Sequence, residues 1–134
     1  MLAAFAACFI VCGCASVHES RPHVAPECRE ITARTFAVLR VIDGDTFVVM
    51  YDGEPTSCRL YGIDTPERGE PGYRDARDEL ARLIDEGGGV VEIHFPTMRK
   101  RDNFGRLLVT ATVGGVDLST ALRDHGFALA VEAR

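Results

Sequence analysis

Short runs of β-branched and apolar residues, separated by turns, constrain the fold of this chain more than any other feature. Three such runs occupy residues 35–42, 46–51 and 57–63. Asp43-Gly44-Asp45 separates the first run from the second. Asp52-Gly53 follows the second and favours a tight hairpin, because glycine accepts a positive φ angle at little cost. The spacing predicts three antiparallel strands joined in sequence.

A helical periodicity follows the third run. One apolar stripe recurs at positions i, i+4, i+7 and i+8, which is typical of an amphipathic helix with a solvated charged face. The stripe consists of Ala76, Leu80, Leu83 and Ile84. Gly87-Gly88-Gly89 should end this helix. The order of segments predicts one helix inserted after the third strand.

The rest of the chain predicts two more strands, over residues 90–95 and 104–113, and a short helix. Ser119 is a candidate N-cap for that helix, and Gly126 is a candidate stop. The fold class is therefore mainly β with α (α+β). We expect a five-stranded OB-fold-like barrel with an inserted helix and a short C-terminal helix. The length of 134 residues suits one such domain, which we place at residues 34–134.

The N-terminal segment predicts export. Residues 1–14 are uncharged and apolar but short for a membrane span, so they are interpreted as a signal peptide. Val11-Cys12-Gly13-Cys14 resembles a bacterial lipobox, with Cys14 as the residue that would carry lipid. Cleavage near Ala15-Ser16 with free secretion is the alternative. Residues 15–33 are interpreted as a polar tether, and the expected location is the periplasm or outer envelope, or outside the cell.

Two cysteines remain in the exported chain. Cys28 and Cys58 could form a disulfide in an oxidising compartment, and the alternative is that Cys58 is a small core residue while Cys28 is free. No Cys/His spacing indicates zinc. The formal net charge of −5 argues mildly against a nucleic-acid partner, although Arg99-Lys100-Arg101 and Arg106 form a local basic patch.

Charge interrupts otherwise apolar strands in three places, and this points to one common site. The segments are Val41 to Thr46, Arg59 to Glu67, and Asp102 to Leu107. In the first two, Asp45 and Asp64 offer hard oxygen ligands that, with the Thr65 carbonyl, suit Ca²⁺ or Mg²⁺.

Two arginines and one further carboxylate complete the predicted site. Arg59 and Arg106 present planar forks that match phosphate oxygens, and Glu67 could orient or deprotonate a water. Together with a cation, these groups describe phosphodiester hydrolysis. The alternatives are that Asp43-Gly44-Asp45 is only a turn, that Arg59 is a structural ion-pair partner of Asp64 or Glu67, and that Arg106 is an exposed edge charge.

The three segments, in their order, resemble the staphylococcal nuclease (thermonuclease) family through VIDGDT, RLYGIDTPE and the D-x-F-G-R-L strand start. The resemblance covers about residues 36–130. It implies an OB-fold barrel and Ca²⁺-dependent cleavage of DNA and RNA, with Ca²⁺ ahead of Mg²⁺ and no obligate protein partner. By this resemblance, the metal residues are Asp45, Asp64 and Thr65, the phosphate-binding residues are Arg59 and Arg106, the general base or water orienter is Glu67, and the outer-shell carboxylate is Asp43.

The chain departs from the family pattern beside the second arginine. Asn103 and Phe104 stand where the family has Lys and Tyr, and Glu132 stands where it has a second Tyr. Phe104 can still stack on a base but cannot donate a hydrogen bond to phosphate. Two other hypotheses remain: a non-catalytic OB-type module that binds nucleic acid or protein on an envelope lipoprotein, and a structural lipoprotein with a vestigial site.

Overall fold

The computed structural model describes residues 34–131. The predicted signal peptide, tether and lipidation site at Cys14 lie outside this part of the chain, as does Cys28. Within the described residues, no helix is long and apolar enough to cross a membrane.

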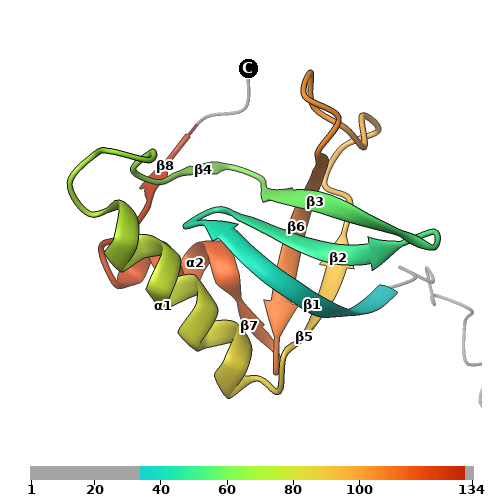
Figure 1. Ribbon diagram of the computed structural model, residues 1–134, viewed down its shortest axis with the longest axis horizontal. Helices are drawn as coiled ribbons and strands as arrows, with labels where there is room; N and C mark the ends of the chain where they lie inside the picture. Colours follow the sequence, from blue (N-terminus) through green and yellow to red (C-terminus); the bar gives the residue numbers. More distant parts are fainter. Residues whose placement is uncertain (1–33, 132–134) are drawn as a thin grey trace, which may run out of the picture.

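Five strands close into a barrel, as predicted (Figure 1). They are β1 (Arg34–Asp43), β2 (Thr46–Tyr51), β3 (Glu54–Leu60), β5 (Val90–His94) and β6 (Leu107–Val113). Neighbours pair in the order β3-β2-β1-β5-β6, and a parallel pairing of β3 with β6 completes the circuit. The closed circuit leaves no barrel strand edge unpaired along its whole length, and it places β3 between β2 and β6.

The first three strands form the predicted antiparallel meander. Asp52 and Gly53 connect β2 to β3 with φ angles of 50° and 85°, which is the geometry of a two-residue hairpin turn with both φ values positive. The third strand has the predicted length but begins and ends three residues earlier than predicted, at Glu54 and Leu60. It ends at Leu60, Gly62 has a φ of 77°, and Ile63 and Asp64 form a separate short strand, β4 (Ile63–Asp64).

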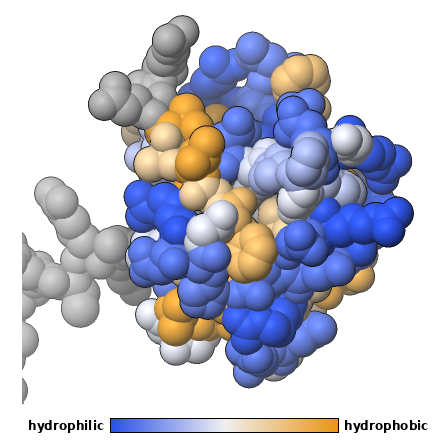
Figure 2. All heavy atoms as spheres, turned by 90° about the vertical axis from the view of Figure 1, so that its left-hand side faces the viewer, coloured by the Kyte–Doolittle hydropathy of each residue, from blue (hydrophilic) through white to orange (hydrophobic). Residues whose placement is uncertain are grey.

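Two helices cover one end of the barrel (Figure 1). Helix α1 (Tyr73–Glu86) buries Ala76, Leu80 and Ile84, in agreement with the predicted stripe. Figure 2 shows the side of the molecule that carries α1, where hydrophilic residues cover most of the surface and apolar patches are small. The charged face of α1 is therefore a solvated face, as predicted.

Helix α2 (Leu118–Asp124) has a different N-cap from the predicted one. The Asp117 carboxylate accepts a hydrogen bond from the Thr120 backbone N–H at 2.7 Å, so Asp117 caps the helix. Ser119 lies inside the helix and is buried, and the helix begins two residues earlier than predicted. Gly126, with a φ of 80°, follows the helix as predicted.

The remaining elements are short. Strand β7 (Val116–Asp117) pairs with β6, and β8 (Leu129–Ala130) pairs with β4. The sequence analysis did not predict β8. It also started the fifth strand too early, since residues 102–106 form a turn in which the Asp102 carboxylate accepts the backbone N–H groups of Phe104 and Arg106, both at 2.9 Å.

The core fills the barrel and the space beneath the helices. Its largest fully buried side chains come from four strands and both helices, and they include Phe47, Leu60, Leu80, Ile93, Leu107, Leu118 and Leu122. Burial of this continuous apolar set stabilises the barrel and holds the strand ends that carry the polar residues. Cys58 belongs to this core with 0% exposure, and burial raises the pKa of its thiol to about 12. Its pairing with Cys28 stays a prediction.

Candidate active site

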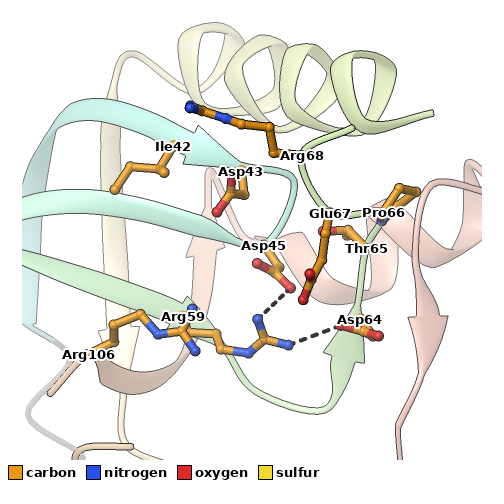
Figure 3. A pocket seen from close by; sticks show the side chains of 10 residues that line it. All are labelled: Ile42, Asp43, Asp45, Arg59, Asp64, Thr65, Pro66, Glu67, Arg68 and Arg106. Carbon is orange, nitrogen blue, oxygen red and sulfur yellow. Dashed lines mark hydrogen bonds and ion pairs between the residues drawn. The ribbon is translucent and has the colours of Figure 1, made fainter. Parts of the chain in front are cut away.

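A polar cavity of about 320 Å³ opens where β1, β3 and β4 end (Figure 3). All the residues predicted to act on metal or phosphate, and the predicted outer-shell carboxylate, line it. The lining residues are Ile42, Asp43, Asp45, Arg59, Asp64, Thr65, Pro66, Glu67, Arg68 and Arg106. Segments that are far apart in the sequence therefore converge on one space. Phe104, the predicted nucleotide contact, lies outside the lining and is 83% exposed.

Arg59 lies between two carboxylates of this cavity. Its Nη1 atom is 3.0 Å from Asp45 Oδ2, and its Nη2 atom is 3.1 Å from Asp64 Oδ1 (Figure 3). The hypothesis that Arg59 is an ion-pair partner of Asp64 is thus confirmed. It does not exclude phosphate binding, because the two contacts use at most two of the five N–H donors of the guanidinium group.

A bend in the backbone brings Asp64 to Arg59. In one straight strand the two side chains would point to opposite faces, since the side-chain direction alternates with each residue. The chain instead leaves β3 at Leu60 and turns at Gly62 before β4, whose Ile63 pairs with Ala130 of β8. The pairing with β8 fixes the direction in which Asp64 enters the cavity.

Asp45 is the most buried acidic group of the site, with 3% exposure. Burial raises the pKa of its carboxyl group above the ordinary value, and the opposing effects of the Arg59 charge and of a 2.8 Å hydrogen bond from the Thr46 hydroxyl do not cancel that rise. A carboxylate in this setting gains from further positive charge, because its solvation by water has been lost. The setting therefore favours a cation near Asp45.

Glu67 approaches the cavity from the loop that precedes α1. Figure 3 shows its side chain directed into the cavity, toward Asp45. Its backbone N–H donates to Glu70 Oε2 at 2.7 Å, and this contact holds the loop at the residue that carries the carboxylate. Arg68, which the sequence analysis did not assign, also lines the cavity, and its only sequence signal was its position next to Glu67.

Arg106 reaches the cavity from the turn before β6. Its Nε atom donates to Asp102 Oδ2 at 2.7 Å, and its guanidinium carbon lies 5.3 Å from the centre of the Phe104 ring. The arginine side chain is 27% exposed and paired with Asp102, so it is a half-buried charge at the edge of the cavity. Asp102, which the sequence analysis left without a role, orients Arg106 through these contacts.

The oxygen donors of the cavity match the ligand preference of a hard cation. Within residues 34–131, no group of three or more His, Cys, Asp or Glu side chains is arranged to hold a metal ion. Asp45 and Asp64 supply two carboxylates, both within 3.1 Å of the same guanidinium, and Thr65 is a buried neighbour on the cavity wall. Hard oxygen donors completed by a backbone carbonyl and water fit Ca²⁺ or Mg²⁺ rather than zinc or another soft metal.

Fold and site together define a class: a small OB-fold barrel whose rim carries a cavity of carboxylates and arginines. Comparison with known proteins supports this class. No family model matches the chain, but it is 30% identical to a thermonuclease of Staphylococcus hyicus over 130 residues, which is 92% of this chain and 75% of that protein. The chain belongs to the thermonuclease family.

Two further relatives extend the comparison. The chain is 43% identical to a thermonuclease of Staphylococcus intermedius over 75% of its own length and 62% of the relative's. It is 33% identical to endonuclease YncB of Bacillus subtilis over 66% of its own length. That match spans 44% of YncB, so the chain corresponds to less than half of this relative.

Proposed function

We propose that this protein is a metal-dependent nuclease that hydrolyses phosphodiester bonds of DNA, RNA or both. The observation that carries the proposal is the convergence of Asp45, Asp64, Glu67, Arg59 and Arg106 on one cavity. Family membership supports it, because the relatives include proteins named thermonuclease and endonuclease. The proposal includes Ca²⁺ as the cation, because hard oxygen donors such as the Asp45 and Asp64 carboxylates suit it.

Asp45, Asp64 and the Thr65 carbonyl would hold the cation. When bound, it would supply positive charge that neutralises the phosphate and polarises a water molecule. Glu67 would orient that water toward phosphorus, and its place at the cavity wall suits this role. The water oxygen would form a bond to phosphorus and lose a proton to solvent, while the bond from phosphorus to an ester oxygen breaks and that oxygen takes up a proton from solvent.

The arginines would bind the phosphate and stabilise the charge that grows on its oxygens during the reaction. Arg59 has at least three N–H donors beyond its two ion-pair contacts, and Arg106 has four beyond its Nε contact with Asp102. Both side chains are oriented by carboxylates before substrate arrives. A phosphate could therefore be bound without a large loss of side-chain freedom.

The proposal includes the cellular location of the protein. An N-terminal signal peptide and a lipid on Cys14 would place the domain in the periplasm or on the outer envelope, and cleavage without lipid would release it. The membrane would then be contacted only through that lipid, and a nucleic-acid substrate would be the sole required partner. An extracytoplasmic position would give the domain access to the Ca²⁺ it is proposed to use.

The test is incubation of the domain, residues 34–134, with plasmid and single-stranded DNA, and with RNA, in the presence of Ca²⁺, Mg²⁺ or a chelator. We expect cleavage with Ca²⁺ and none with chelator. Binding of the same nucleic acids under saturating Ca²⁺ without any cleavage would refute the nuclease and favour the non-catalytic module.

A further inference from the structure

Helix α1 touches the turn that carries Asp43 and Asp45 through its first residue. Tyr73 is 8% exposed, and its hydroxyl oxygen is 3.0 Å from the Ile42 carbonyl oxygen and 3.0 Å from Asp43 Oδ1. The hydroxyl has one hydrogen, so these two acceptors share it. Tyr73 therefore connects α1 with both the backbone and the carboxylate of the turn, 30 residues earlier in the chain.

The same turn has no free space on the helix side. A Cβ atom at Gly44 would lie 2.7 Å from the Ala76 Cβ and 3.0 Å from the Thr65 hydroxyl oxygen. Glycine is thus required at position 44, because this residue packs closely between α1 and Thr65. The contact with Ala76, one turn after Tyr73, places the turn and the helix at a fixed separation.

The turn is joined to the arginine strand on its other side. The Asp45 carbonyl accepts a hydrogen bond from the Leu60 backbone N–H at 2.8 Å, and Leu60 follows Arg59. A shift of the turn would therefore change the distance between the Asp45 carboxylate and the Arg59 guanidinium. The position of α1 is coupled to the geometry of the cavity through this short chain of contacts.

We propose that Tyr73 is a positioning residue for the active site: its hydroxyl holds the turn of residues 42–45 so that Asp43 and Asp45 face the cavity at the separation that cation binding requires. The proposal rests on the proposed function, because the role it assigns is support of the cation-binding carboxylates. Tyr73 lies outside the cavity lining and touches neither substrate nor the reacting atoms.

The test is Tyr73→Phe, which removes the hydroxyl and keeps the buried ring. We expect the Kd for Ca²⁺, measured by calorimetry without nucleic acid, to rise about 10-fold, which is the lower end of the effect of losing an outer-shell partner of a metal site. We expect kcat to fall by a similar factor while KM for DNA changes little. Tyr51→Phe is the matched control, because Tyr51 lies at the end of β2 away from the turn and packs between Phe36 and Phe95.

Hydrogen exchange of the Leu60 amide supplies a readout that needs neither cation nor substrate. This amide is bonded to Asp45, so looser anchoring of the turn should speed its exchange in Tyr73→Phe relative to wild type and to Tyr51→Phe. Wild-type exchange at Leu60 would overturn the proposal. Faster exchange with unchanged Ca²⁺ affinity and turnover would also overturn it, since the bond would then serve the fold alone. A wild-type protein without nuclease activity would instead refute the proposed function, and the exchange rate would still decide whether Tyr73 holds the turn.

Discussion

The two arginines of the cavity are carried by different kinds of segment, a strand of the barrel and a surface turn. Arg59 lies in β3, which is paired with β2 on one side and β6 on the other, and its partner Asp45 has a side chain only 4% exposed. Arg106 is the last residue of a surface turn, its partner Asp102 is four residues away, and the neighbouring Phe104 is 83% exposed. The two arginine side chains are about equally exposed, at 26% and 27%, but Arg59 is paired with a buried carboxylate of another segment, whereas Arg106 is paired with a carboxylate of its own turn. The difference between the two arginines therefore lies in how strongly the fold depends on each ion pair, since both line the same cavity.

The largest expected effects concern the two arginines, whose replacement should lower activity equally but stability unequally. Both Arg59→Ala and Arg106→Ala should lower kcat/KM by about 10²-fold or more, because each removes donors from the phosphate. Arg59→Ala should also lower the free energy of unfolding by about 3 kcal/mol, since it leaves Asp45 buried and unpaired. For Arg106→Ala the loss should be about 1 kcal/mol or less.

Denaturant unfolding and steady-state kinetics on the same samples measure both quantities. Arg34→Ala is the control, because Arg34 forms an exposed ion pair with Asp52 outside the cavity and should affect neither quantity appreciably. Equal stability losses for Arg59→Ala and Arg106→Ala would contradict the comparison, and wild-type cleavage by both variants would contradict the site.

A smaller effect is expected at the exposed aromatic ring. Phe104→Ala should weaken binding of single-stranded DNA about 10-fold, because base stacking on an aromatic ring contributes about 1–3 kcal/mol. Its stability should not change, since the ring is mostly exposed. Fluorescence anisotropy with a labelled oligonucleotide measures the affinity, and Met98→Ala, at another exposed apolar residue near this turn, is the control. Equal losses in the two variants would show that the ring has no specific role.

The smallest effect concerns the pH dependence of the turn. Burial acts to raise the pKa of Asp102, but hydrogen bonds from the Arg106 side chain and from two backbone N–H groups outweigh it, so the pKa lies below the ordinary 3.8. A carboxyl group with a lowered folded-state pKa stabilises the fold above its unfolded pKa, and this contribution is lost as the pH falls through the folded-state value. We therefore expect a loss of stability below pH 3.8 that Asp102→Asn removes. Identical pH profiles for the variant and wild type in unfolding experiments would contradict this assignment.

Much of the fold was predictable because local patterns and packing agree. The apolar stripe of α1, the Asp52-Gly53 hairpin and the order of strands each follow from periodicity or from turn chemistry over a few residues. The errors occurred where tertiary contacts decide the outcome. The strand that begins at residue 57 in the prediction ends early because β4 pairs with β8, and Asp117 rather than Ser119 caps α2 because the helix starts at Leu118.

The sequence by itself determined which residues are available for chemistry and the order in which they occur, since acidic and arginine residues placed in otherwise apolar strands are costly without a partner or a ligand. Only the tertiary structure decided which of them meet. Barrel closure through β3 and β6, the bend before Asp64 and the contact of Tyr73 with Asp43 all join residues distant along the chain. Such contacts depend on the packing of the whole core, and no local sequence pattern specifies them.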